Sequence, residues 1–124
     1  MVNWQLTKHF NLMDDVRLAC PCCHLFPVTA RVTEHMTLVE QMRVDLGFPI
    51  VVNSGYRCVL HNRAVGGVPN SQHRVFATDL APESGEKAEL DQMYAWADAH
   101  FTGIGRYDSF IHVDLREKRV RWVG

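Results

Sequence analysis

The sequence predicts an α+β fold in which helices cover one face of a small, mainly antiparallel sheet. Two stretches carry apolar residues at the three- and four-residue spacing of a helix, and short β-branched runs lie between and after them. With 124 residues, the chain is long enough to build one hydrophobic core and short for two. We therefore expect residues 1–124 to form a single domain.

The N-terminal third should contain an arm followed by a helix. Residues 4–18 are expected to form an irregular arm or a short strand, anchored by Phe10 and Leu12. A helix should begin near Thr29 and end at Gly47, because a glycine can adopt the left-handed conformation that closes a helix. The apolar residues that share one face of this helix are Val32, Met36, Val39, Met42 and Leu46.

The middle of the chain alternates short strands with loops. Residues 49–53 are β-branched and predict a buried strand, and residues 76–80 predict a second one. Between them, residues 59–65 are expected to form a helical turn, and residues 66–70, with Gly-Gly and Pro-Asn, a loop. Asp79 lies in the second strand, and a carboxylate that faces inward needs a compensating charge, which a bound cation would provide.

The C-terminal part predicts a helix and then several strands. Ser84 is the expected N-cap of a helix that runs to about Ala99, with Glu86 in its first turn, where a carboxylate suits the helix dipole. The buried stripe of this helix should be Leu90, Met93, Tyr94 and Ala97. The closing strands, two or three in number and arranged as a meander, are expected at 103–107, 110–115 and 120–123.

The charge balance argues against electrostatic binding to a polyanion. There are 13 basic and 14 acidic residues, a formal net charge of −1, so we expect neither nucleic acid nor an anionic membrane as a partner. The basic run at residues 116–121 is best interpreted as a solvated edge, and contact with an acidic polymer is the alternative. The N-terminal residues lack the pattern of a signal peptide, and no segment is apolar for the length of a membrane helix. We expect synthesis in the cytoplasm and no membrane insertion.

The chain contains four cysteines, which are candidate metal ligands. Three of them, Cys20, Cys22 and Cys23, are crowded together, and Cys58 follows later. In a reducing compartment, free thiols or a metal cluster are favoured over disulfides. We favour buried thiols that serve as small apolar groups over a second, structural zinc ion. Its ligands would be Cys20, either Cys22 or Cys23, and Cys58, with His24 as a further candidate.

Three further residues supply the ligands of a catalytic zinc site. His73 and Asp79 flank the start of the second strand, and His112 interrupts an apolar strand, where an imidazole has no packing role. Two imidazoles and a carboxylate are a common ligand set for zinc that keeps one open position. Zinc lowers the pKa of a bound water toward roughly 7 and polarises a carbonyl, which is the chemistry of amide hydrolysis.

Such a reaction also needs a general base within hydrogen-bond reach of that water. Asp114 lies two residues after His112 on the same strand face, so it could take the proton or orient a ligand histidine. Asp108, in the preceding turn, is the other candidate. The sequence does not choose between the two.

Substrate binding is expected near the end of the first strand. Arg57 follows that strand, and its guanidinium could hold a substrate carboxylate through two parallel hydrogen bonds, which would select a free C-terminus. Other polar groups near the same centre could orient the substrate or stabilise an oxyanion, namely Tyr56, Ser71, Gln72 and Tyr107.

Several spaced motifs carry a resemblance to a known family. They are Ser54-Gly55-Tyr56-Arg57, His61-Asn62, Gly66-Gly67, Asn70-Ser71-Gln72-His73, Ala77-x-Asp79, Gly103-Ile104-Gly105 and Phe110-Ile111-His112-Val113-Asp114. Together they resemble the M15 family of zinc peptidases, above all its small D-Ala-D-Ala carboxypeptidase-like members, which are often encoded by phages. The resemblance runs from the Cys-Pro-Cys-Cys segment to the final tryptophan. It implies the fold shared with the hedgehog signalling domain, zinc ligands at His73, Asp79 and His112, and a carboxylate-binding role for Arg57.

Two positions depart from the family pattern. The pattern has one residue more between His73 and Asp79, so either the loop after His73 tightens or Asp79 turns away from the metal. Several branches carry a glutamate three residues before the last histidine, where this chain has Ser109. A base must then come from elsewhere in the chain.

The resemblance implies a zinc peptidase that cleaves D-amino-acid-containing bonds of peptidoglycan stem peptides, as a carboxypeptidase or an endolysin-type endopeptidase. We expect a monomer that acts on the cell wall after release during phage lysis, or as part of a phage particle. The alternative is a non-catalytic, zinc-containing phage structural or peptidoglycan-binding protein. A third, weaker reading is a redox or regulatory zinc protein built on the cysteines.

Overall fold

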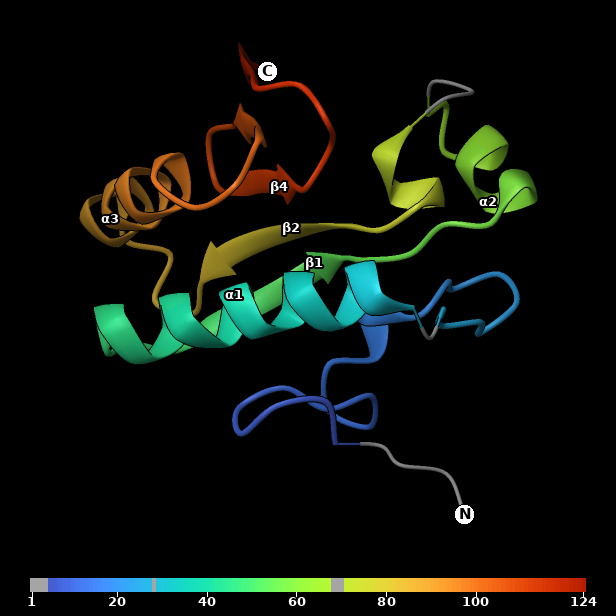
Figure 1. The fold of residues 1–124 in the computed structure, drawn as a ribbon, viewed down its shortest axis with the longest axis horizontal. Coiled ribbons are helices and arrows are strands. Elements are labelled where there is room, and N and C mark those ends of the chain that lie inside the picture. The colour runs from blue at the N-terminus through green and yellow to red at the C-terminus, as the bar shows by residue number, and fades with distance from the viewer. Residues whose placement is uncertain (1–4, 28, 68–70) are drawn as a thin grey trace.

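The computed structural model describes residues 5–27, 29–67 and 71–124, and its α+β fold confirms the predicted class (Figure 1). The strands are β1 (Ile50–Ser54), β2 (Ala77–Pro82), β3 (Gly103–Arg106), β4 (Ile111–Asp114) and β5 (Val120–Val123). The α-helices are α1 (Ala30–Leu46), α2 (Val59–Ala64) and α3 (Lys87–Asp98), and the 3-10 helices are η1 (Val16–Leu18) and η2 (Gln72–Arg74). Residue 4 of the predicted arm and residues 68–70 of the predicted loop lie outside the described residues.

Helix α1 begins and ends where the sequence predicts. The hydroxyl of Thr29 accepts a hydrogen bond from the backbone N–H of Val32 at 3.2 Å and so caps the first turn. Gly47 ends the helix with a φ of 76°, in the left-handed region that a glycine adopts without strain. The buried face of α1 consists of Val32, His35, Met36, Val39 and Met42.

Helix α3 begins later than predicted, so Ser84 is not its N-cap. Glu86 occupies the cap position without a side-chain cap hydrogen bond. The hydroxyl of Ser84 instead accepts from the N–H of Glu86 at 3.1 Å and donates to a carboxylate oxygen of Glu89 at 2.6 Å. Ser84 therefore closes the turn that precedes the helix, a local competition that sequence spacing does not resolve.

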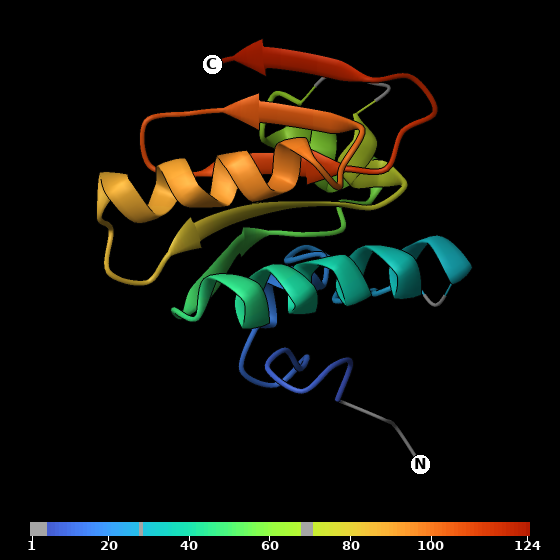
Figure 2. The same cartoon turned by 60° about the vertical axis from the view of Figure 1, so that its left-hand side comes forward.

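The sheet has the strand order β1-β2-β4-β3-β5, so the predicted meander is wrong at its last step. Strands β1 to β4 pair in antiparallel fashion, whereas β5 pairs with β3 in parallel. Strand β4 lies between β2 and β3 and has no free edge. The last strand therefore adds to the outer edge of β3 (Figure 2).

The two long helices α1 and α3 cover one face of the sheet, and the hydrophobic core lies between them and the strands (Figure 2). Ile111 and Val113 of β4 belong to this core. Because side chains alternate along a strand, His112 and Asp114 point to the opposite face. The polar residues of β4 are thus gathered on the face that α1 and α3 leave uncovered.

The N-terminal arm is irregular, as predicted. Gln5 and Asn11 form an isolated β-bridge, Phe10 is buried, and Leu12 packs at the edge of the core. Among the described residues, none of the helices combines the length and the apolar character that crossing a membrane requires.

Candidate metal centre

His73, Asp79 and His112 come from three different elements and meet on the face of the sheet opposite the long helices. Asp79 in β2 and His112 in β4 are directly paired across the two strands, and His73 lies in η2. Asp79 Oδ1 lies 3.2 Å from His73 Nε2 and 3.1 Å from His112 Nδ1, and the two nitrogens are 3.2 Å apart. The structure therefore brings together the three residues that the sequence singles out.

The loop before β2 tightens, which resolves the shorter spacing between His73 and Asp79. The hydroxyl of Ser71 accepts from the N–H of His73 at 3.2 Å, and the N–H of Val75 donates to the carbonyl of Gln72 at 3.0 Å. This 3-10 turn uses fewer residues per turn than an α-helix. Asp79 consequently faces both imidazoles instead of turning away.

The hydrogen bonds of the two histidines determine which nitrogen is free to bind a metal. His73 Nδ1 lies 2.7 Å from the carbonyl oxygen of Gly55, and His112 Nε2 lies 2.7 Å from Asp114 Oδ2. Both oxygens only accept, so these nitrogens carry the protons, and the lone pairs of neutral imidazoles lie on His73 Nε2 and His112 Nδ1. These two lone pairs and the carboxylate of Asp79 point at one another, an arrangement that a cation or an added proton must stabilise.

The distances suit a zinc ion. A tetrahedral site with bonds of about 2.0–2.1 Å has edges of about 3.3–3.4 Å between its ligand atoms. The three observed separations, 3.1 to 3.2 Å, are close to one face of such a tetrahedron. The fourth corner then remains for water or substrate.

The electrostatics of the site favour a cation. Burial by itself raises the pKa of Asp79, but its close contacts with His112 and His73 outweigh burial and lower that pKa to about 2. Burial lowers the pKa of His112, whereas its contacts with Asp114 and Asp79 raise it, and the net shift is upward. The carboxylates therefore stay ionised and attract positive charge.

Asp114 is completely buried, and its oxygens are fully engaged. Besides the contact with His112, Oδ1 accepts from the backbone N–H and from Nε of Arg116 at 3.1 and 2.8 Å, and Oδ2 accepts from a terminal nitrogen of the same guanidinium at 2.6 Å. Burial raises the pKa of Asp114, but the hydrogen bonds from Arg116 and His112 dominate and lower it strongly. Asp114 could take a proton or orient a ligand histidine. This geometry favours the second role, in which Asp114 orients His112.

Asp108, the other predicted base, is exposed in the turn between β3 and β4. It borders a different cavity, together with Lys87, Arg106, Tyr107 and Val123. It does not line the cleft next to the metal centre. The structure therefore gives no support to Asp108 as the base.

A cleft of about 420 Å³ opens beside the two histidines. Its lining residues in the described chain are Arg57, Gly67, Ser71, Gln72, His73, Tyr107, His112, Arg116 and Trp122. Four of the five predicted substrate-binding residues are among them. The exception is Tyr56, which packs against the hydrophobic core, so its predicted substrate contact has no support in this geometry.

Arg57 is placed to bind an anion. Its side chain is half-buried, and its Nε is buried without a hydrogen-bond partner among the described residues. Within the described part of the chain, its one side-chain hydrogen bond is a long one of 3.3 Å to the hydroxyl of Ser71. Burial lowers the pKa of the guanidinium, which indicates that a positive charge is held there without full compensation.

Sequence reasoning missed Arg116 and Trp122, which also line the cleft. The guanidinium of Arg116 lies over the Trp122 ring, 5.0 Å from its centroid, and the same ring lies 5.1 Å from that of His112. The indole N–H of Trp122 donates to the hydroxyl of Tyr107 at 2.9 Å. Only the parallel pairing of β5 with β3 brings Trp122 to this position, and no local pattern signals that pairing.

The comparisons with known proteins agree with this site. A family model described as Peptidase M15 matches residues 13–114, a range that includes all three converging residues and Arg57. No curated protein matches the chain.

Proposed function

The chain belongs to the peptidase M15 family, and from this membership we propose that it is a zinc-dependent peptidase that cleaves a D-amino-acid-containing bond in peptidoglycan stem peptides. The observation that carries the proposal is the convergence of His73 Nε2, Asp79 Oδ1 and His112 Nδ1 beside an open cleft. Each imidazole is held by a protein acceptor in the tautomer that a metal ligand needs.

The chemistry follows from the residues around the ion. Bound to these three ligands, zinc would supply a hydroxide at neutral pH and polarise the scissile carbonyl. The Gly55 carbonyl and Asp114 hold the two imidazoles in place. The stacked rings of Tyr107 and Phe110, with centroids 4.5 Å apart, support one wall of the cleft.

The cleft favours a substrate that ends in a carboxylate. Two guanidinium groups line it, and while Arg116 is paired with Asp114, the Nε of Arg57 has no partner in the described chain. A free C-terminal carboxylate can satisfy Arg57 through charged hydrogen bonds. We therefore propose carboxypeptidase action, with the D-Ala-D-Ala terminus of a stem peptide as the substrate that the motif resemblance indicates.

One observation favours the alternative, a non-catalytic zinc protein that binds peptidoglycan or belongs to a phage particle. None of the nine described residues that line the cleft is Asp or Glu. No carboxylate other than the ligand Asp79 is then available to take a proton from a zinc-bound water.

The test uses the zinc-loaded chain and a synthetic stem pentapeptide that ends in D-Ala-D-Ala. Released D-alanine, measured by mass spectrometry, should appear with the free acid and be strongly reduced with the C-terminal amide. The His73→Ala variant should release none. Zinc binding without hydrolysis of the pentapeptide or of whole muropeptides would reject the enzyme in favour of the binding protein.

The site of action follows from the substrate. We propose that the chain works as a monomer on the cell wall, after release during phage lysis or as part of a phage particle.

A further inference from the structure

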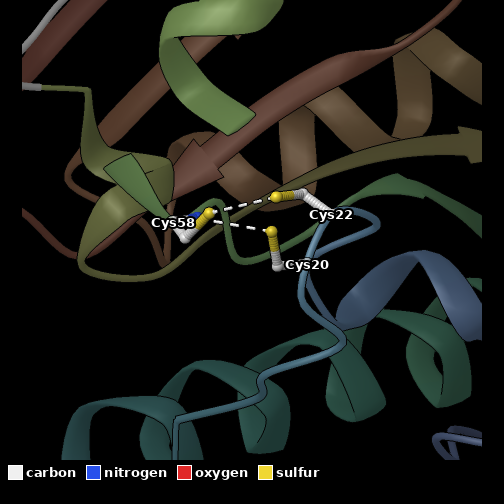
Figure 3. A group of neighbouring side chains, drawn as sticks. All are labelled: Cys20, Cys22 and Cys58. Carbon is white, nitrogen blue, oxygen red and sulfur yellow. Dashed lines mark hydrogen bonds between the residues drawn. The ribbon is translucent and has the colours of Figure 1, made fainter. Parts of the chain in front are cut away.

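A second group of metal-binding side chains lies outside the cleft. The thiols of Cys20, Cys22 and Cys58, which we name the thiol cluster, all lie within 4.8 Å of one another. Cys20 and Cys22 belong to the loop after η1, and Cys58 is the N-cap of α2 (Figure 3). Of the four cysteines only Cys20 is buried, so the prediction of buried apolar thiols holds for that residue alone.

The sulfur positions suit a metal better than a disulfide. Cys58 Sγ and Cys22 Sγ are 3.8 Å apart, far beyond the roughly 2.05 Å of a disulfide. A tetrahedral zinc site with Zn–S bonds of about 2.3 Å has S···S edges of about 3.8 Å. The separation of Cys22 Sγ and Cys58 Sγ thus equals that of two thiolates on one ion, and Cys20 Sγ lies within 4.8 Å of both.

Backbone N–H groups around the cluster stabilise thiolates, the form that binds a metal. The N–H of Cys58 donates to Cys20 Sγ at 3.4 Å, and the N–H of His61 donates to Cys58 Sγ at 3.4 Å.

We propose that the thiol cluster binds a second zinc ion with a structural role, separate from the proposed catalytic ion. Three thiolates leave one coordination position, and the turn that carries Cys20 and Cys22 offers two donors for it, Cys23 and His24. This turn is tight: the N–H of His24 donates to the carbonyl of Cys20 at 2.7 Å, and His24 has a φ of 60°. Four cysteines, or three with a histidine, are both ligand sets of structural zinc.

The ion would connect the N-terminal arm to the substrate side of the cleft. Next to the cluster, the N–H of Tyr56 donates to the carbonyl of Leu18 at 2.9 Å, and a Cβ on Gly55 would lie only 2.4 Å from the same oxygen. Arg57 follows directly, and its N–H donates to the carbonyl of His73 at 2.8 Å. The second ion thus fixes a strand end that carries the carboxylate-binding arginine.

The metal content of the purified full chain tests this directly. Under reducing conditions we expect two zinc ions per chain in the wild type and one in the His73→Ala variant. The Cys58→Ser variant should hold one, and the double variant none. Since each substitution removes one site, failure of the thiol cluster can be distinguished from failure of the catalytic centre.

Cobalt identifies the ligands. Co²⁺ added to the metal-free chain should give an intense thiolate-to-cobalt absorption band in the wild type and in His73→Ala. The band should be lost in Cys58→Ser and in Cys22→Ser, whose thiol is exposed and whose replacement leaves the core untouched. Comparing Cys23→Ser with His24→Ala identifies the fourth donor, because only the ligand's replacement should alter the band.

Thiol alkylation gives a readout that does not depend on how the variants fold. In wild-type protein, zinc should protect three or four cysteines from iodoacetamide, as counted by mass spectrometry. Three results together would overturn the proposal. The wild type would hold a single zinc that His73→Ala removes, cobalt would give no thiolate band, and zinc would leave the rate of alkylation unchanged.

Discussion

At the scale of single residues, the proton positions on His73 and His112 decide what the site can bind. Each ring gives one N–H to a protein oxygen, the Gly55 carbonyl or the Asp114 carboxylate. The opposite nitrogen of each ring then faces Asp79 with a lone pair. The residue types could be read from the sequence, whereas the acceptors that fix the tautomers appear only in the folded chain.

Replacing Asp114 with asparagine tests its role. An amide can turn its NH₂ group toward His112 Nε2 and then favours the tautomer whose proton lies on Nδ1, the ligand nitrogen. We expect zinc affinity at the catalytic centre to fall by about 10- to 100-fold, as for other residues that orient a ligand histidine. Zinc titration of the Asp114→Asn variant measures this, with Asp108→Asn as a control that should bind as the wild type does. Normal zinc affinity with no turnover at saturating zinc would instead identify Asp114 as a base.

His35 should make the stability of the protein depend on pH. The side chain is completely buried between Phe76 and Phe101, and its Nε2 lies 2.8 Å from the hydroxyl of Thr78. Burial lowers the pKa of His35 to about 3, below the roughly 6.5 of an unfolded chain. Because the folded pKa is depressed, the stabilisation is present above about pH 6.5 and is lost as pH falls toward 3.

The His35→Gln variant measures this contribution, since an amide can keep the hydrogen bond to Thr78 and does not titrate. Between pH 7 and pH 5 the unfolding free energy of the wild type should fall by about 2 kcal/mol more than that of the variant. Urea unfolding of both metal-free proteins measures the difference between their unfolding free energies at each pH. Groups that titrate in the same way in both proteins do not contribute to this difference. Parallel pH profiles would show that folding leaves the pKa of His35 unshifted.

At the scale of elements, the glycines of β3 make room for the polar face of β4. Gly103 is paired with Asp114, and Gly105 with His112. A Cβ on Gly103 would lie 2.0 Å from Asp114 Oδ1 and 2.5 Å from Arg116 Nε. The Asp114 carboxylate, which orients His112, can therefore keep its position only because β3 has glycines at these two positions.

The Gly103→Ala variant should accordingly damage the metal centre from the adjacent strand. The added methyl must displace Asp114 or Arg116, which we expect to cost about 1–3 kcal/mol of stability, as overpacking commonly does. Zinc affinity at the catalytic centre should fall as well. Urea unfolding and zinc titration measure both effects. Val120→Ala, which changes the exposed residue paired with Gly103 on β5, is the control. A stability loss with unchanged zinc affinity would contradict the proposed dependence.

The elements also show what the sequence could predict. Helix α1 carries its own signals, a threonine cap, a repeating apolar face and a terminal glycine, so its bounds were predicted closely. The strands β2 and β4 were predicted from local composition, and their polar residues pointed to the candidate metal centre. The position of β5 depends on which sheet edge remains free after β4 has paired, so Arg116 and Trp122 could not be placed in the cleft beforehand.

At the scale of the whole molecule, the thiol cluster joins parts that are distant in sequence. Cys20 and Cys22 lie in a segment with little regular structure, and Cys58 begins the short helix α2. The backbone hydrogen bonds from Tyr56 to Leu18 and from Arg57 to His73 connect the same region to the metal centre. Segments with little regular structure tend to have low local stability, which a further link can raise.

A zinc ion at the thiol cluster should therefore stabilise both segments that it joins and leave the far helix unaffected. In His73→Ala, which lacks the catalytic ion, we expect zinc to slow amide hydrogen exchange in residues 16–25 and 55–64, with α3 unchanged. At a free zinc concentration 100 times the dissociation constant, the stabilisation should be about 2.7 kcal/mol. Adding Cys22→Ser to the same background should abolish both effects. Equal slowing of exchange in the two proteins would mean that zinc acts elsewhere, and the arm would then be held by protein contacts such as those of Phe10 and Leu18 with the core.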